Sequence, residues 1–151
     1  MNWKKECMNS NLMPGIIMLE KKKIKVDEEV NQSNGNTLLH YASSFGFYNA
    51  IRALVEIYNA DINKQNKLGY SPLYYIVNNN DTNIFNFQYF VKLKKINLEL
   101  CDKNNSKPMN WKEECEKGNL MPGIIMLEQK KINVDDEVNS SNGNTLPRSS
   151  T

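Results

Sequence analysis

The sequence predicts an all-α solenoid, in which about four helix–turn–helix units joined by short hairpin loops stack on one another. Three observations predict this fold class. Residues 36–63 have the pattern of two helices and an extended exit, apolar residues recur every 36 positions, and residues 1–38 return almost unchanged as residues 109–146. A single unit of this kind cannot bury its own apolar face, so each unit must pack against its neighbours.

The stretch at residues 36–63 shows the unit most completely. Thr37 is a suitable N-cap for a first helix, because its hydroxyl can accept a hydrogen bond from a free backbone N–H. Leu39 and Ala42 follow at helical spacing, and Gly46 ends this helix, since glycine adopts the left-handed conformation readily. A second helix has a broad apolar face made by Ala50, Ile51, Leu54 and Val55.

Apolar residues recur with a period of 36 along the whole chain. Steps of 36 from Met18 reach Leu54, Phe90 and Met126. Two further series keep the same register: Ile24, Ala60, Ile96 and Ile132, then Val26, Ile62, Leu98 and Val134. A fixed period of this size indicates stacked helix pairs.

A near-exact duplication is superimposed on this period. Residues 1–38 return after 108 residues, which is three periods of 36. The differences are mostly polar, such as Lys5 against Glu113, and among the apolar positions only Met8 changes, to Glu116. A packing constraint and recent copying both explain this pattern.

The central residues resemble the ankyrin repeat. The string T-L-L-H-Y-A at residues 37–42 is similar to the family's T-P-L-H-x-A helix opening, and S-P-L at residues 71–73 resembles it again. The exit A-D-I-N at residues 60–63 and the glycines at 46 and 69 match the family's exit, turn and hairpin positions. The resemblance implies structural roles for Thr37, Leu39, His40, Ala42, Gly46, Gly69 and Pro72, with His40 joining helix opening and hairpin by hydrogen bonds.

We divide the chain into unit 1 (residues 1–36), unit 2 (37–70), unit 3 (71–108) and unit 4 (109–144), followed by a truncated tail at 145–151. The openings of units 1 and 4 depart from the ankyrin motif, and the period exceeds the roughly 33 residues typical of the family. In unit 1, Asn11 is a candidate N-cap for the second helix, with Pro14 in its first turn. We expect residues 109–151 to be the least stable part, because solenoid ends need polar caps.

Four aromatic residues crowd the second helix of unit 3. They are Phe85, Phe87, Tyr89 and Phe90. Since all four cannot face inward from one helix, we expect one or two of them to be exposed.

Composition argues against several classes of function. The net charge of +2 gives no general attraction to nucleic acid or acidic membranes, and no apolar run reaches the roughly 20 residues that span a membrane. The chain has three cysteines without a pairing pattern, which favours a reducing, cytoplasmic compartment. No phosphate loop, catalytic triad or metal-ligand spacing surrounds the single histidine, His40, so we expect no enzyme activity, cofactor or metal.

The ankyrin resemblance implies a protein-interaction scaffold that binds a protein partner on its concave face, and we expect a monomer. The implied contact positions are hairpin tips and first-helix ends: Asn34, Asn36, Ser44, Phe45, Lys67, Leu68, Tyr70, Asn78 and Asn79. Phe45, Leu68 and Tyr70 are the strongest candidates, because they are large and lie on turns. The alternative is a regulatory or targeting part of a longer protein, such as a channel, a kinase or a secreted effector.

Overall fold

The computed structural model describes residues 2–78, 84–100 and 102–104, the single residues 113, 116, 118, 123, 124 and 127, and the backbone of 137–139 and 144–145. Six helices and two short strands are defined within these ranges. They are α1 (Trp3–Met8), α2 (Met13–Glu20), α3 (Leu38–Phe45), α4 (Tyr48–Glu56), α5 (Pro72–Val77), α6 (Ile84–Lys92), β1 (Glu137–Asn139) and β2 (Asn144–Thr145). None of the described helices is both long enough and apolar enough to cross a membrane.

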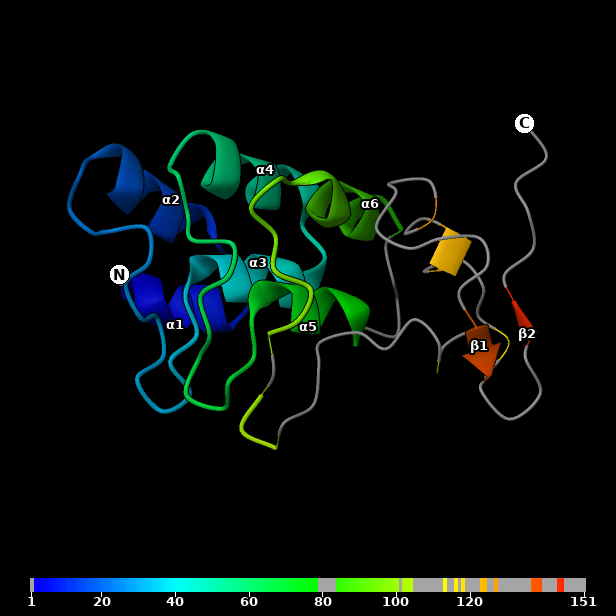
Figure 1. Ribbon diagram of the computed structural model, residues 1–151. Helices are drawn as coiled ribbons and strands as arrows, with labels where there is room; N and C mark the ends of the chain where they lie inside the picture. Colours follow the sequence, from blue (N-terminus) through cyan, green and yellow to red (C-terminus); the bar gives the residue numbers. More distant parts are fainter. Residues whose placement is uncertain are drawn as a thin grey trace.

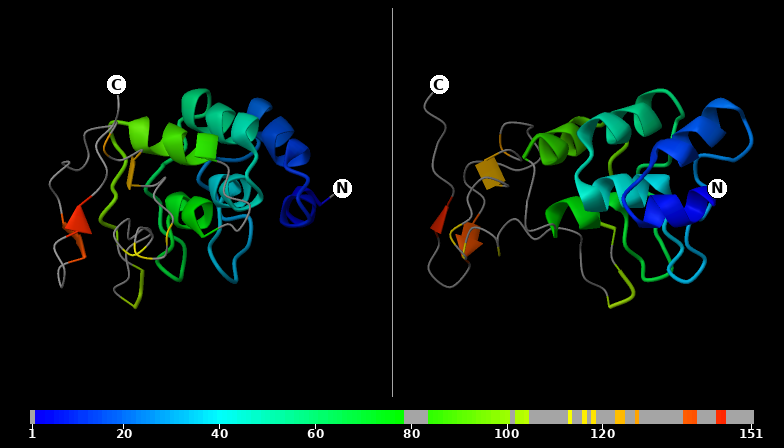
Figure 2. Two further views of the ribbon diagram at one scale, coloured as in Figure 1. Left: turned by 90° about the vertical axis from the view of Figure 1, so that its right-hand side faces the viewer. Right: turned by 180° about the vertical axis from the view of Figure 1, so that it is seen from behind.

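The helices form two rows (Figure 1). The first helices of the units, α1, α3 and α5, lie in one row, which we call the inner helices, and α2, α4 and α6 lie in the other, the outer helices. Within the inner row, α3 packs against both α1 and α5. Extended loops project from the inner row on the side away from the outer helices, and two further views show the same arrangement (Figure 2). The predicted all-α helix–turn–helix solenoid is therefore confirmed.

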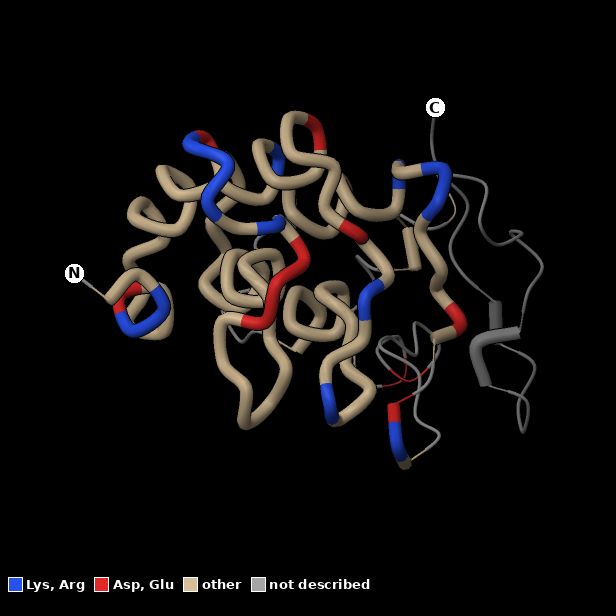
Figure 3. Tube along the Cα trace, turned by 90° about the vertical axis from the view of Figure 1, so that its left-hand side faces the viewer, with Lys and Arg blue, Asp and Glu red and all other residues tan. Residues whose placement is uncertain are grey.

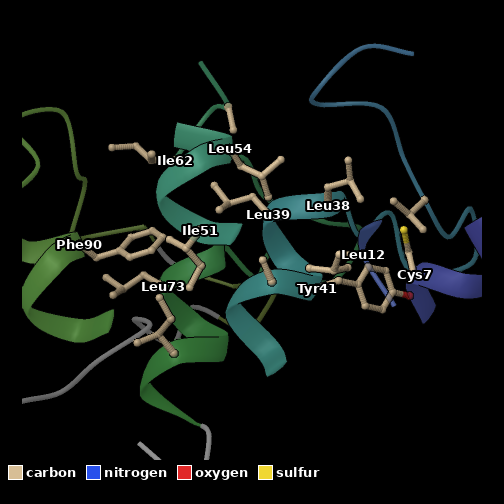
Figure 4. Packing of buried hydrophobic residues seen from close by; sticks show 14 of the residues in the cluster. Cys7, Leu12, Leu38, Leu39, Tyr41, Ile51, Leu54, Ile62, Leu73 and Phe90 are labelled. Carbon is tan, nitrogen blue, oxygen red and sulfur yellow. The ribbon is translucent and has the colours of Figure 1, made fainter. Parts of the chain in front are cut away.

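The core runs continuously through the described units. Leu54 and Phe90, one period apart on successive outer helices, are both fully buried. Leu39 of α3, Ile51 of α4 and Leu73 of α5 belong to the same buried cluster, and each is at most 1% exposed (Figure 4). The next residue of this series, Met126, lies outside the described residues. Units 2 and 3 thus bury the same register position against each other, as stacking requires.

Helix ends follow local sequence at most positions. Thr37 and His40 form a capping box at the start of α3, and Gly46 ends that helix in the left-handed conformation with φ of 72°. Ser71 precedes Pro72 at the start of α5. The prediction that Asn11 caps α2 is wrong: Leu12 holds the N-cap position, and the Asn11 amide donates instead to Glu6 Oε2 at 3.2 Å.

The aromatic residues of α6 divide as expected. Phe90 and Phe87 are buried, whereas Phe85 is 65% exposed. Tyr89 is half-buried, and its hydroxyl donates to Glu56 on α4 at 3.0 Å. The same kind of bond joins the preceding outer helices, where the Tyr58 hydroxyl donates to Glu20 Oε2 at 2.6 Å.

A side-chain acceptor links each exit segment to the next one along the stack. Asp27 Oδ1 accepts the backbone N–H of Asp61 at 2.9 Å, and Asn63 Oδ1 accepts the N–H of Asn97 at the same distance. Acceptors and donors are each separated by 36 residues, so one contact repeats at successive junctions. We call this pair of contacts the exit ladder.

The duplicated segment shows matching backbone features where both copies are described. Ser10 after α1 has a positive φ of 73°, and Gly118, 108 residues later, has a positive φ of 93°. The antiparallel bridge between Asn31 and Asn36 corresponds to the antiparallel pairing of β1 and β2 through Asn139 and Asn144. The two strands are thus the hairpin of the second copy.

Candidate interaction surface

The hairpins that project from the inner helices pack on one another in sequence. The Lys67 N–H donates to the Asn34 carbonyl at 2.8 Å, and the Lys103 N–H donates to the Leu68 carbonyl at 3.1 Å. The Lys67 ammonium also donates to the Gln32 carbonyl. Gly69 has a φ of +83°, and a Cβ added there would lie 2.8 Å from the Asp102 Cα. The tips therefore form one continuous edge, and only glycine fits at position 69.

His40 connects the start of α3 to the second hairpin. Its Nδ1 accepts the Thr37 backbone N–H at 3.1 Å and lies 2.9 Å from the Thr37 hydroxyl. Its Nε2 lies 2.9 Å from the Tyr70 carbonyl. Because a carbonyl oxygen only accepts, Nε2 must carry the proton, and Nδ1 must be bare to accept from an N–H. The neutral imidazole protonated at Nε2 satisfies both contacts.

Burial fixes the charge state of this histidine. The side chain has no exposed surface. Burial lowers the pKa of His40 from 6.5 to about 4, against a smaller opposite effect of its hydrogen bond to the Tyr70 backbone. His40 is therefore neutral at physiological pH. With both nitrogens engaged in backbone contacts, it holds the fold together and is not placed to transfer protons.

A buried asparagine organises the polar interior of the same hairpin. Asn66 Oδ1 accepts the N–H groups of Leu68 and Tyr70, both at 2.9 Å. Its Nδ2 donates to Asn36 Oδ1 at 2.7 Å and to the Tyr75 hydroxyl at 3.0 Å. All four hydrogen-bonding capacities of one side chain are thereby used, as a buried amide requires.

This network corrects one predicted contact position. Asn36 is only 4% exposed, because Asn66 and Tyr75 cover its side chain, and the Tyr75 hydroxyl donates to its Oδ1 at 3.3 Å. The prediction that Asn36 presents a side chain to a partner is wrong. Its partners lie 30 and 39 residues away in sequence, so spacing within one unit gave no signal for the contact.

Two tyrosines form an aromatic pair beside the hairpin. The rings of Tyr70 and Tyr74 lie 3.7 Å apart and 2° from parallel. A hydrogen bond with Tyr70, together with burial, raises the pKa of the Tyr74 hydroxyl to about 12, so it stays protonated. Leu68 at the adjacent tip is 49% exposed. Tyr74 was absent from the predicted contact residues, although its place in α5, where α3 has His40, signals a departure from the motif.

The predicted residues at the inner-helix ends lie apart from this tyrosine pair. Phe45 is half-buried, with its ring 5.9 Å from that of Tyr41 and 5.5 Å from that of Phe47. Ser44 is half-buried, and Asn78 is exposed at the end of α5. Asn79 lies outside the described residues. The candidate surface thus has two aromatic areas, one at Phe45 and one at Tyr70 and Tyr74, with Asn34, Lys67 and Leu68 at the tips.

The described residues offer little for covalent or metal chemistry. Within them, no three histidine, cysteine, aspartate or glutamate side chains come together as metal ligands. Cys7 is buried, and this burial raises the pKa of its thiol to about 11, which disfavours the nucleophilic thiolate. What the surface presents is the exposed Leu68, the half-buried rings of Phe45, Tyr70 and Tyr74, and polar tips.

Repeated helix pairs with stacked hairpins define the class of protein as a helical solenoid. The family model described as "Ankyrin repeats (3 copies)" matches residues 39–120, more than half of the chain, so the protein belongs to the ankyrin repeat family. Among solved structures it is similar to EF0377, an ankyrin repeat protein, with 22% sequence identity and a TM-score of 0.60. That similarity covers 89% of this chain and 62% of the other, so this chain spans less than two thirds of that protein. No curated protein matches.

Proposed function

We propose that this chain is a non-enzymatic scaffold that binds a protein partner on its concave face, the surface formed by inner helices and hairpin tips. Ankyrin repeats are generally protein–protein interaction modules, and the family is typically non-enzymatic. The observation that carries the proposal is the combination of an exposed Leu68 at a hairpin tip with the parallel rings of Tyr70, on the same hairpin, and Tyr74, in α5. Aromatic residues held in place are effective anchors, because binding does not have to order them.

Rigidity of this surface follows from the buried network beneath it. The backbone on either side of the Leu68 tip is fixed by Asn66, and the Tyr70 carbonyl is fixed by His40. A preordered hairpin lowers the entropic cost of association. The four predicted units would supply a surface longer than any single hairpin, which suits an extended or helical segment of a partner.

The remaining features of the proposal concern assembly and compartment. We propose a monomer that works in the reducing interior of the cell, consistent with the buried free thiol of Cys7. The alternative role, a regulatory or targeting part of a longer protein, would use the same concave surface. A test of the surface therefore addresses both roles.

The test compares two variants in affinity capture. F45A/L68A/Y70A removes the three strongest candidate anchors, and I57A removes a side chain that is 67% exposed at the end of an outer helix. We expect the triple variant to lose at least tenfold in affinity for proteins that the wild type captures, while I57A retains them. Far-UV circular dichroism and the Tm establish that both variants fold. Equal capture by the wild type and a folded triple variant would remove the concave face as the binding site.

A further inference from the structure

The helix pair of unit 1 attaches to unit 2 through a junction smaller than the next one along the stack. Helix α1 contacts α3 less extensively than α3 contacts α5. Gly15 in α2 is buried against unit 2, and a Cβ added there would lie 2.8 Å from the Cδ2 of Leu38 at the start of α3. We call the contact of residues 3–27 with unit 2 the first junction. A solenoid opens most readily where neighbouring units share the least contact.

Two hydrogen bonds join the exposed side of the first junction. The Tyr58 hydroxyl donates to Glu20 Oε2 at 2.6 Å, and the Asp61 N–H donates to Asp27 Oδ1 at 2.9 Å. Figure 3 views the stack from the unit 1 side and shows acidic residues in the exit segments, where the second of these bonds lies. Two carboxylates of unit 1 thus meet two donors of unit 2, which sets the register of one unit on the other.

Unit 4 carries the same set of junction residues. The three residues of unit 1 named above return unchanged at an offset of 108: Gly15 as Gly123, Glu20 as Glu128 and Asp27 as Asp135. The buried apolar residues of its helix pair also return unchanged: Cys7 as Cys115, Leu12 as Leu120 and Leu19 as Leu127. The eight positions that differ between the copies are exposed in unit 1, apart from the half-buried Glu28. Residues 111–135 therefore have the side chains that residues 3–27 use to bind unit 2.

The sequence after unit 4 does not repeat the sequence after unit 1. The string P-R-S at residues 147–149 stands at the places where α3 has L-H-Y, at residues 39–41. The α3 sequence that receives unit 1 is thus not repeated after unit 4. Unit 3 separates unit 4 from unit 2 of the same chain, so the unit 2 surface that matches unit 4 is that of a second copy.

We propose that unit 2 accepts unit 4 of a second copy in place of its own unit 1. Residues 111–135 of the incoming copy replace residues 3–27, with Glu128 accepting from the Tyr58 hydroxyl and Asp135 from the Asp61 N–H. The hairpin at residues 31–36 stays on unit 2, because it continues directly into α3. Each copy offers unit 4 and receives on unit 2, so the contact is head-to-tail and adds further copies rather than closing on a dimer.

This docking replaces one junction with another made by the same side chains. The displaced helix pair no longer has to be ordered, which offsets part of the entropic cost of association. Unit 1 is tethered beside unit 2 at an effective concentration on the order of millimolar. The monomer is therefore the form in dilute solution, and the head-to-tail form grows with concentration. The inference goes beyond the scaffold role, and capture of a partner on the concave face does not depend on it.

The test places a photoreactive amino acid at the first junction of the full chain, as Asp61→p-benzoylphenylalanine. This substitution replaces an exposed side chain and keeps the backbone N–H that makes the junction bond. Irradiation links position 61 to whichever unit occupies the junction. Mass spectrometry distinguishes the two occupants, because I-K-V-D-E-E-V at residues 24–30 reads I-N-V-D-D-E-V at residues 132–138.

Two matched variants act on the two occupants. E128A/D135A removes both carboxylates from unit 4, and E20A/D27A removes the equivalent pair from unit 1. The same chemical change thus weakens the incoming unit in one variant and the resident unit in the other. K21Q changes an exposed position at which the copies differ and is the control.

We expect a product of twice the chain mass, linked between position 61 and residues 132–138, whose yield rises as the protein concentration approaches about 1 mM. The yield should fall about threefold or more in E128A/D135A, rise about threefold or more in E20A/D27A and stay unchanged in K21Q. Loss of structure in unit 1 of E20A/D27A would open the same site, so the rise is expected in either case.

Three results would overturn the inference. The first is the absence of any product of doubled mass from both the wild type and E20A/D27A. The second is a product whose yield E128A/D135A leaves unchanged. The third is a product of doubled mass in which position 61 is linked to residues 24–30, since unit 1 of the second copy would then be the occupant.

Discussion

Lys4 and His40 hold equivalent places 36 residues apart on successive inner helices, yet they tie those helices to the rest of the fold in different ways. Lys4 is half-exposed, and its ammonium lies 3.6 Å from a carboxylate oxygen of Glu28. His40 is fully buried, bonded on both sides, and covered by the ring of Tyr75 at 6.0 Å. The two residues share a position in the repeat, but their partners and their burial differ.

The difference teaches that a contact made from the same repeat position contributes to stability according to its burial. Water and salt weaken an exposed ion pair, so when one partner is removed the other is solvated at little cost. Water cannot replace a buried imidazole that bonds to two backbone groups, so its removal leaves an N–H and a carbonyl without hydrogen bonds in the interior. We therefore expect the hydrogen bonds of His40 in unit 2 to stabilise the fold far more than the ion pair of Lys4 with Glu28 in unit 1.

The largest expected effect comes from replacing the two residues themselves. H40A should lower the free energy of unfolding by about 3 kcal/mol, because it leaves a small cavity and two unsatisfied backbone groups. K4A should lower it by about 0.5 kcal/mol or less. Urea denaturation followed by circular dichroism measures both values. Equal losses for the two variants would contradict the comparison.

The pH dependence sharpens the same comparison. Between pH 6.5 and about 4 the unfolded chain protonates its histidine while the folded chain does not, so the unfolded state gains protons and stability falls as pH falls. The contribution is complete above pH 6.5 and amounts to about 3 kcal/mol lost by pH 4. Urea midpoints across this range should show the decline in wild type and in K4A. H40Q should lack it, and a decline of the same size in H40Q would assign it to carboxylates.

A smaller contrast is expected in the hairpins. Asn66 is buried with four hydrogen bonds, whereas Asn31 is half-buried, accepts the Ser33 N–H at 2.9 Å and donates weakly to Tyr41 at 3.4 Å. N66A should lower the free energy of unfolding by about 2 kcal/mol and N31A by about 1 kcal/mol or less. Thermal unfolding of the two variants side by side tests this. The reverse order would show that burial is not the deciding factor.

The smallest effect is expected from exchange between the two copies. K21Q places the residue of unit 4 at an exposed position of unit 1 and should change the free energy of unfolding by less than about 0.5 kcal/mol. The same urea titration provides the measurement. A loss above 1 kcal/mol in this variant would show that exposed positions at which the copies differ also contribute to stability.

Features set by local sequence could be predicted for the fold. The N-cap at Thr37, the left-handed Gly46 and the burial of Leu54 and Phe90 each depend on a residue and its neighbours within one unit or on the period. The capping of α2 could not, because Asn11 is drawn away by a bond to Glu6 that competes with the helix end. Short polar residues offer several local partners, and sequence alone does not rank them.

Less of the candidate surface could be predicted, since it depends on contacts between units. Leu68 and Tyr70 were predicted as contact residues from their turn positions, but the burial of Asn36 requires Asn66 from unit 2 and Tyr75 from unit 3. The pairing of Tyr70 with Tyr74 likewise arises from how the hairpin meets α5. A position within a repeat predicts where a residue lies, whereas its exposure is decided by the residues of the neighbouring repeat.

The exit ladder sets the order in which we expect the repeats to unfold under a pulling force. In each of these hydrogen bonds a side chain of one exit segment accepts the backbone N–H of the following exit segment: Asp27 from Asp61, and Asn63 from Asn97. A pulling force applied from the C-terminal side would break the hydrogen bond at Asn97 before the one at Asp61. We therefore expect the repeats to unfold one at a time under tension, beginning at the C-terminal side.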